Sequence, residues 1–178
     1  MSRFELVRDP SGDQHLEDLY DDMVKAGFGK EFPINWFTSQ AMRPDILEAT
    51  WFLTKRILVE GLLPASLKQM IATTISVHNQ CRYCTVTHTG ALEALGISKE
   101  VIESCILDKD LSGVPVQYRD ILQFAVKAAK DPNSIQDEDY QKLKENGLSH
   151  KEILEIVMMS AFTNFINTWA DASGIEID

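Results

Sequence analysis

The apolar residues of this chain recur three and four positions apart from about residue 40 onward, the spacing that places them on one face of an α-helix. No run alternates apolar and polar residues with β-branched enrichment, which is the pattern of a half-buried strand. We therefore expect an all-α fold, a single helical domain of about seven to eight helices. With 44% hydrophobic residues, a chain of 178 residues can bury such a core without metal or disulfide staples.

Proline, glycine and capping residues set the expected ends of these helices. Gly61 ends one helix, and Pro64 begins the next. Ser149 and Glu152 have the spacing of a capping box at the start of the last helix. The expected helices span about residues 14–26, 44–60, 64–79 and 81–96, then a short segment capped by Ser98, and about residues 117–130, 137–146 and 149–172.

The charge of the chain restricts its partners. Acidic residues outnumber basic ones by 27 to 17, and the net charge is −10. Without a basic cluster, that charge opposes binding to a phosphate backbone, so we expect no nucleic-acid partner. No stretch approaches the roughly 18 to 20 consecutive apolar residues that cross a bilayer, and the first residues lack the apolar core of a secretory signal. We therefore expect no membrane association and a cytoplasmic location.

Two of the three cysteines, Cys81 and Cys84, form a CxxC pair, and His88 follows four residues later. On a helix these side chains project from one face, so two sulfurs and an imidazole can meet. A place in the first helical turn favours a thiolate, because the free N–H groups and the helix dipole lower the thiol pKa. The thiolate attacks an O–O or S–S bond, and the second thiol then resolves the product. The pattern predicts a redox-active dithiol at the N-terminus of a core helix, acting on peroxides or a disulfide-type substrate.

Two other uses of this motif stay open. Zinc would need four ligands, which the motif and His78 together would supply, although no second CxxC or HxxxH occurs. The thiols could also be purely structural. Covalent haem is excluded because Thr85, not histidine, follows the second cysteine. We expect no metal and no cofactor, an inert core thiol at Cys105, and a packing or capping role for His78.

The segment SVHNQCRYCTVTHTGALEALGIS resembles the CxxCxxxH signature of the alkylhydroperoxidase D-like branch of the carboxymuconolactone decarboxylase superfamily. The C-terminal segment GLSHKEILEIVMMSAFTNFINTWADASGIEID is similar to the peroxidase-related members of that group. The likeness covers about residues 33–178, which we take as one domain, preceded by a helical arm and connector at residues 1–32. The resemblance implies a helical homo-oligomer (dimer, trimer or hexamer), a hydroperoxide substrate, and a thiol, thioredoxin-like or lipoyl reductant.

The resemblance also implies a role for each residue of the site. Cys84 would be the peroxidatic thiol, Cys81 the resolving thiol, and His88 part of a proton relay. Gln69 stands where the family usually has a glutamate, and an amide can hold a hydrogen bond but cannot take up a proton at neutral pH. Tyr83 stands between the cysteines where the best-known members have a histidine, so we expect a neutral hydrogen-bonding role for it.

Two hypotheses follow from these residues. The first is a thiol-dependent peroxidase with an antioxidant role, in which Gln69 orients His88. The second is a redox-sensing or scaffold homo-oligomer that keeps the dithiol but catalyses weakly, because Gln69 replaces the glutamate base. Decarboxylase or lactone chemistry is disfavoured, since nothing in the sequence indicates an anion-binding pocket.

Overall fold

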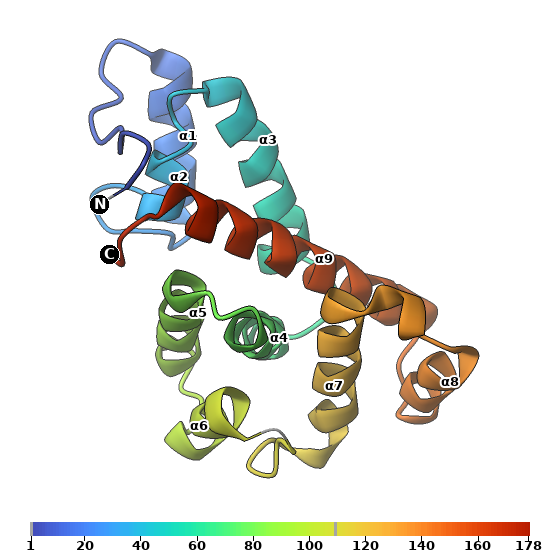
Figure 1. The fold of residues 1–178 in the computed structure, drawn as a ribbon. Coiled ribbons are helices and arrows are strands. Elements are labelled where there is room, and N and C mark those ends of the chain that lie inside the picture. Colours follow the sequence, from blue (N-terminus) through green and yellow to red (C-terminus); the bar gives the residue numbers. More distant parts are fainter. Residues whose placement is uncertain (1, 109) are drawn as a thin grey trace.

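The computed structural model describes residues 2–108 and 110–178, and within them the chain is helical without a β-strand (Figure 1). The expected all-α fold is confirmed. The helices are α1 Gln14–Lys25, α2 Asn35–Thr38, α3 Pro44–Thr54, α4 Ala65–His78, α5 Arg82–Ala94, α6 Lys99–Leu107, α7 Val116–Lys130, α8 Asp137–Glu145 and α9 His150–Ser173, with a π-helix η1 at Lys55–Val59 and a 3₁₀ turn η2 at Pro132–Ser134.

Most helix ends follow the local capping signals. The Ser98 side chain accepts a hydrogen bond from the backbone of Val101 at the start of α6. Ser149 and Glu152 form the expected capping box at the start of α9. That helix ends at Gly174, whose left-handed φ of 63° suits a residue without a Cβ. Eight of the nine α-helices in the described residues correspond to segments expected from the sequence.

Two features differ from expectation. The short helix α2 was not expected, because none of its neighbours in sequence caps its N-terminus with a side chain. The helix that begins at Pro44 does not stay α-helical up to Gly61; it widens into η1 after Thr54. The ammonium group of Lys68 donates hydrogen bonds to the backbone carbonyls of Ile57 (2.9 Å) and Glu60 at the end of that wide turn.

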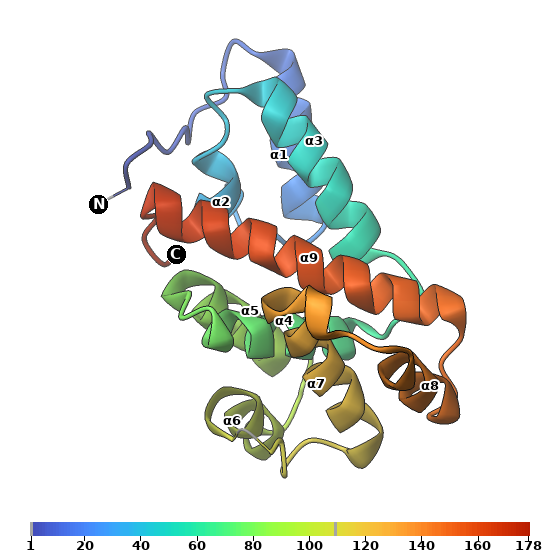
Figure 2. The ribbon, with the colours of Figure 1, turned by 45° about the vertical axis from the view of Figure 1, so that its right-hand side comes forward.

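Helix α4 lies at the centre of the molecule and packs against α5, α6, α7 and α9. Figures 1 and 2 show α9 running across the molecule, with α1 to α3 on one side and α4 to α8 on the other. Ile71 and Ile75 of α4, Leu92 of α5 and Ile156 of α9 are fully buried in the core between these helices. The first residues of α5 therefore lie against α9. In residues 2–108 and 110–178, no helix has both the length and the apolar character needed to cross a membrane.

Candidate active site

The dithiol lies at the start of α5. A short turn follows α4, with Gln80 in the left-handed region at φ 60°, and Cys81 is the N-cap residue of α5. Cys81 is 0% exposed and Cys84 is 2% exposed. Their Sγ atoms donate to successive carbonyls of α9, Cys81 to Asn167 O at 4.0 Å and Cys84 to Ile166 O at 3.9 Å. The motif is thus held between the N-terminus of α5 and one side of α9.

The surroundings of Cys84 decide its resting protonation state. All three cysteines are free thiols, and all three are buried. The pKa of Cys84 is raised above its ordinary value, first because the Cys81 thiol hydrogen-bonds to it and second because burial disfavours the charged thiolate. The thiolate expected from the helix N-terminus is therefore outweighed, and Cys84 rests as a thiol.

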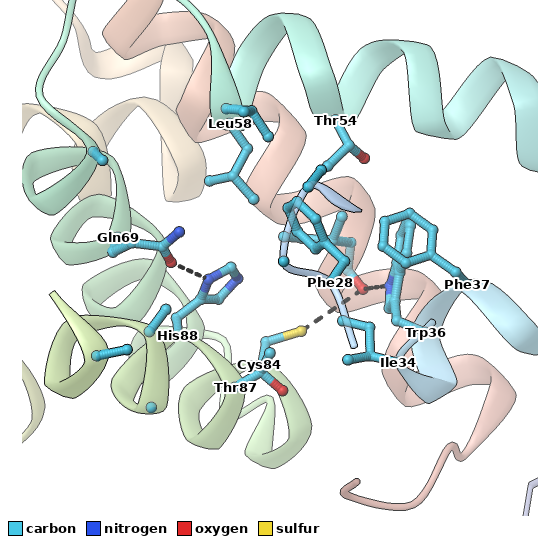
Figure 3. A pocket seen from close by; sticks show the side chains of 18 of the residues that line it. Phe28, Ile34, Trp36, Phe37, Thr54, Leu58, Gln69, Cys84, Thr87 and His88 are labelled. Atoms are coloured by element: carbon cyan, nitrogen blue, oxygen red, sulfur yellow. Dashed lines mark hydrogen bonds between the residues drawn. The ribbon is translucent and has the colours of Figure 1, made fainter. Parts of the chain in front are cut away.

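His88 lies one turn beyond Cys84 and is also buried. Its Nδ1 atom is 2.7 Å from Oε1 of Gln69 on α4, and because an amide oxygen only accepts, Nδ1 carries the proton. Nε2 is then the unprotonated nitrogen. Burial lowers the pKa of His88 to about 4, so the imidazole is neutral at pH 7. Figure 3 shows the ring between the Gln69 side chain and the Cys84 sulfur.

A cavity of about 530 Å³ opens beside these groups. Cys84, His88, Gln69 and Tyr83 are among its lining residues, whereas Cys81 is not. The other lining residues are small, aliphatic, aromatic or hydroxyl-bearing: Ala26, Gly27, Phe28, Ile34, Trp36, Phe37, Thr54, Leu58, Val59, Ala65, Thr87, Gly90, Ala91, Ala94, Leu95, Phe162 and Ile166. None of the lining residues bears a charge. The cavity therefore suits a neutral molecule with an apolar body.

The hydroxyl group of Tyr83 contacts the first turn of α2 and the side chain of Asp178. The O–H donates to the Asp178 carboxylate at 2.6 Å, and its oxygen accepts from the backbone N–H of Trp36 at 3.2 Å. Burial, with the Asp178 hydrogen bond as a smaller cause, raises the pKa of Tyr83 above its ordinary value. The phenol is neutral, and its contacts are those of a residue that positions other groups. Nothing in the sequence around the motif signals Asp178 or Trp36.

The residues expected to lie outside the redox chemistry are placed as follows. His78 Nδ1 bonds Thr74 O of its own helix at 2.9 Å, which is a local capping contact. Cys105 is buried on α6, and burial raises its pKa to about 11. Within residues 2–108 and 110–178, no group of three or more His, Cys, Asp or Glu side chains is arranged to hold a metal ion.

Comparison with known families identifies the segment that carries the motif. Residues 44–111, from the start of α3 to just beyond α6, match the sequence model of the carboxymuconolactone decarboxylase family. This segment is therefore similar to the carboxymuconolactone decarboxylase family. No curated protein sequence matches the chain significantly.

Solved structures share the fold of this chain over nearly its whole length. An alkylhydroperoxidase AhpD core protein from Ralstonia eutropha JMP134, a peroxidase-related protein, is 24% identical and has a TM-score of 0.88, over 99% of this chain and 92% of that one. A peroxidase-related protein from Silicibacter sp. TM1040 is 23% identical with a TM-score of 0.86, again over 99% and 92%. The family match over residues 44–111 supports the resemblance expected from the sequence, and the fold of these two proteins is shared over nearly the whole chain.

A third similar structure comes with a ligand. The debrominase Bmp8, as a cysteine-to-alanine variant in complex with 2,3,4-tribromopyrrole, is 22% identical with a TM-score of 0.81, over 100% of this chain and 94% of that one. At this level of identity the likeness shows a shared fold, and the chemistry of each member has to be argued from its own site.

Proposed function

We propose that this protein is a thiol-dependent oxidoreductase that reduces organic hydroperoxides through a Cys81/Cys84 dithiol–disulfide cycle. One observation carries the proposal: Cys84 lines an apolar cavity that it shares with a neutral, hydrogen-bonded histidine, and Cys81 lies directly behind it. A buried thiol needs a base, and His88 has its Nε2 lone pair free for that role.

The proposed reaction begins with proton transfer from the Cys84 thiol to His88 Nε2. The thiolate attacks the terminal oxygen of ROOH, the O–O bond breaks, and the alkoxide takes the proton from His88 and leaves as ROH. Cys84 is then a sulfenic acid. The Cys81 thiol attacks its sulfur and expels water, so that one hydroperoxide and two thiols give ROH, water and a disulfide. A thiol or lipoyl-type dithiol reductant returns two electrons to that disulfide.

The cavity supports an apolar substrate. Besides Tyr83, its walls contain four aromatic side chains, those of Phe28, Trp36, Phe37 and Phe162. A charged substrate would lose its hydration there without meeting an opposite charge. We therefore expect higher rates with a neutral aryl hydroperoxide such as cumene hydroperoxide than with a fatty-acid hydroperoxide, which carries a carboxylate.

Stopped-flow oxidation of the reduced protein by cumene hydroperoxide, followed by mass mapping of the cysteines, tests the proposal. Cys84→Ser should abolish peroxide consumption, and Cys81→Ser should allow one turnover that ends at a sulfenic acid on Cys84. Cys105→Ser is the matched control, since this buried thiol lies on α6 and does not line the cavity, and it should react like the unmodified protein. Full turnover by Cys84→Ser would refute the proposal.

Reductive dehalogenation is a second candidate, favoured by the aromatic walls of the cavity and by the debrominase Bmp8 among the similar structures. In that reaction an aryl bromide and the two thiols would give the arene, HBr and the same disulfide. Release of bromide from 2,3,4-tribromopyrrole by the reduced protein would support this candidate. Disulfide formation with cumene hydroperoxide, without bromide release from the tribromopyrrole, would support the peroxidase proposal and rule out the second candidate.

A further inference from the structure

Helix α2 cannot be explained by its own segment of the sequence. It has four residues, Asn35–Thr38, and isolated helices of that length do not form in water. Ile34 precedes it as the N-cap residue and offers no side-chain acceptor to its first N–H groups. All four residues are nevertheless buried, so these N–H groups need partners from elsewhere in the fold.

The partners come from two distant parts of the chain. Asp178, beyond α9, accepts from the backbone N–H of Asn35 through Oδ1 at 2.7 Å. Its Oδ2 accepts from the Tyr83 hydroxyl at 2.6 Å, and the Tyr83 oxygen accepts in turn from the backbone N–H of Trp36 at 3.2 Å. A carboxylate at the first turn also stabilises the helix dipole. The segment of Asp178 is itself held by Asn35, whose Nδ2 donates to Glu176 O at 3.1 Å.

The same helix forms the cavity wall beside the dithiol. Trp36 lines the cavity, and its Nε1 donates to Ile166 O at 3.1 Å. That carbonyl also accepts from Cys84 Sγ at 3.9 Å. Figure 3 shows the two contacts converging on one oxygen atom, which lies between the Cys84 sulfur and the indole nitrogen. The position of α2 therefore determines whether Trp36 closes the cavity wall at the carbonyl that Cys84 contacts.

We propose that Asp178 is a positioning residue of the dithiol site: as a remote N-cap of α2, it orients Tyr83 and holds the Trp36 indole on the Ile166 carbonyl that Cys84 also contacts. Loss of this carboxylate leaves the first N–H groups of α2 without their acceptor, so the helix frays, the cavity wall opens and Cys84 becomes more accessible. The role concerns access to Cys84, and it holds for any substrate that the dithiol takes.

Alkylation of the reduced, full-length protein by N-ethylmaleimide tests this, with the rate at each cysteine followed by mass mapping. Asp178→Ala should raise the rate at Cys84 about tenfold, the factor by which losing a helix N-cap shifts a local equilibrium. The rate at Cys105, buried on α6, reports general loosening of the fold and should not change. Asp178→Asn should give a smaller rise than Asp178→Ala, because its amide oxygen still caps Asn35 while its NH2 group cannot accept the Tyr83 O–H.

Tyr83→Phe provides the test of coupling. If Tyr83 and Asp178 act as one unit, the double variant should raise the Cys84 rate no further than the stronger single variant. Asp137→Ala, which removes an exposed carboxylate from α8, is the control for net charge and should have no effect. Four results would each overturn the inference. Two concern Asp178→Ala: an unchanged rate at Cys84, or a parallel rise at Cys105. The others are a Cys84 rate in Asp178→Asn as high as in Asp178→Ala, and additive effects in the double variant. None of these measurements requires turnover, so they stand apart from the peroxidase proposal.

Discussion

Gln69 gives His88 a hydrogen-bond acceptor without giving it a counter-charge. The amide oxygen fixes the tautomer with Nε2 unprotonated, and burial keeps the ring neutral. This arrangement can take a proton from Cys84 but stabilises the resulting imidazolium poorly. The resting site is therefore a neutral thiol–imidazole pair, and we expect Gln69 to limit the rate of proton transfer from Cys84 to His88.

Gln69→Glu should raise the rate of Cys84 oxidation by cumene hydroperoxide at pH 7 by about ten- to a hundredfold. A carboxylate at this position stabilises the protonated ring during proton transfer. The expected rise in rate lies at or below the lower end of the range, about 10²- to 10⁴-fold, that general acid–base catalysis contributes. Stopped-flow single-turnover rates measure it, and Gln69→Leu, which removes the hydrogen bond, should be slower than the unmodified protein. Equal rates for all three proteins would mean that His88 takes no part in the proton transfer.

The buried His88 should also make stability depend on pH. Its pKa is about 4 in the fold against 6.5 for an ordinary histidine, so below pH 6.5 the unfolded chain binds a proton that the native state does not. The free energy of unfolding therefore falls as the pH drops from 6.5 toward 4. Between pH 7 and pH 5 this group should contribute a loss of about 2 kcal/mol. Urea denaturation at both pH values, compared with His88→Gln, isolates the contribution, since the variant should lose correspondingly less stability.

At the scale of elements, η1 and the loop after it depend on one buried ion pair. The Lys68 ammonium group lies 2.5 Å from Glu155 Oε1 of α9, with the two side chains 1% and 12% exposed. Glu155 also accepts from the backbone N–H groups of Leu62 (2.7 Å) and Leu63 (3.3 Å). Gly61, at φ 119°, lies against this carboxylate, where a Cβ atom would collide with it. The pair thus joins η1, α4 and α9 behind the cavity.

Lys68→Met should lower the free energy of unfolding by about 3–5 kcal/mol, because it leaves Glu155 and two backbone carbonyls buried without their cation. Lys99→Met is the matched control: Lys99 forms an exposed pair with Glu103 on α6, and its loss should change stability by no more than about 0.5 kcal/mol. Thermal or urea unfolding gives both values. Similar stabilities for the two variants would show that the buried pair is dispensable.

The elements that the sequence predicts best are those whose ends have local signals. Pro44, Ser98 and Ser149 mark helix starts that the structure reproduces. Helix α2 could not be predicted from local capping signals, because the residue that caps it, Asp178, is 143 residues away from Asn35 in the sequence. The local sequence does not predict the π-helix η1 either, because η1 is held by hydrogen bonds from Lys68 of α4 to backbone carbonyls at its end.

Part of the candidate site could likewise be predicted from the sequence, and part depends on contacts between distant segments. The spacing of Cys84 and His88 predicts that they share one helix face, and the structure places both on the cavity. The position of Gln69 follows from the family resemblance, and the structure brings it to His88. The Trp36 wall depends on a contact with Ile166 across 130 residues, which no local pattern encodes. The cavity and its neutral lining are therefore products of tertiary packing.

At the scale of the whole molecule, α9 leaves part of its apolar surface uncovered. Leu154, Met158 and Phe165 lie on one face of this helix and are 64%, 42% and 44% exposed. Phe165 also packs edge-on against Trp36, so this face adjoins the cavity wall. We propose that a second copy of the chain covers it, in line with the homo-oligomer implied by the family resemblance.

Leu154→Glu should reduce the oligomeric state, because it places a charge in the middle of a buried apolar contact. Light scattering coupled to size-exclusion chromatography measures the mass directly. Val116→Glu is the control, since Val116 is 72% exposed on α7, outside this face, and should leave the mass unchanged. A monomeric unmodified protein at tens of micromolar would contradict the proposal, as would identical masses for the two variants.

The position of Cys81 behind Cys84 has a consequence for the order of events in turnover. Cys84 lines the cavity, whereas Cys81 is fully buried and does not. In the proposed cycle, a reductant that attacks the disulfide would therefore reach the Cys84 sulfur through the space that the oxidant has just left, and the two would not occupy it together. Initial rates over a grid of both concentrations should give the parallel double-reciprocal lines of a ping-pong reaction, with each reactant inhibiting when it is in large excess. Intersecting lines would point to a separate approach to the disulfide.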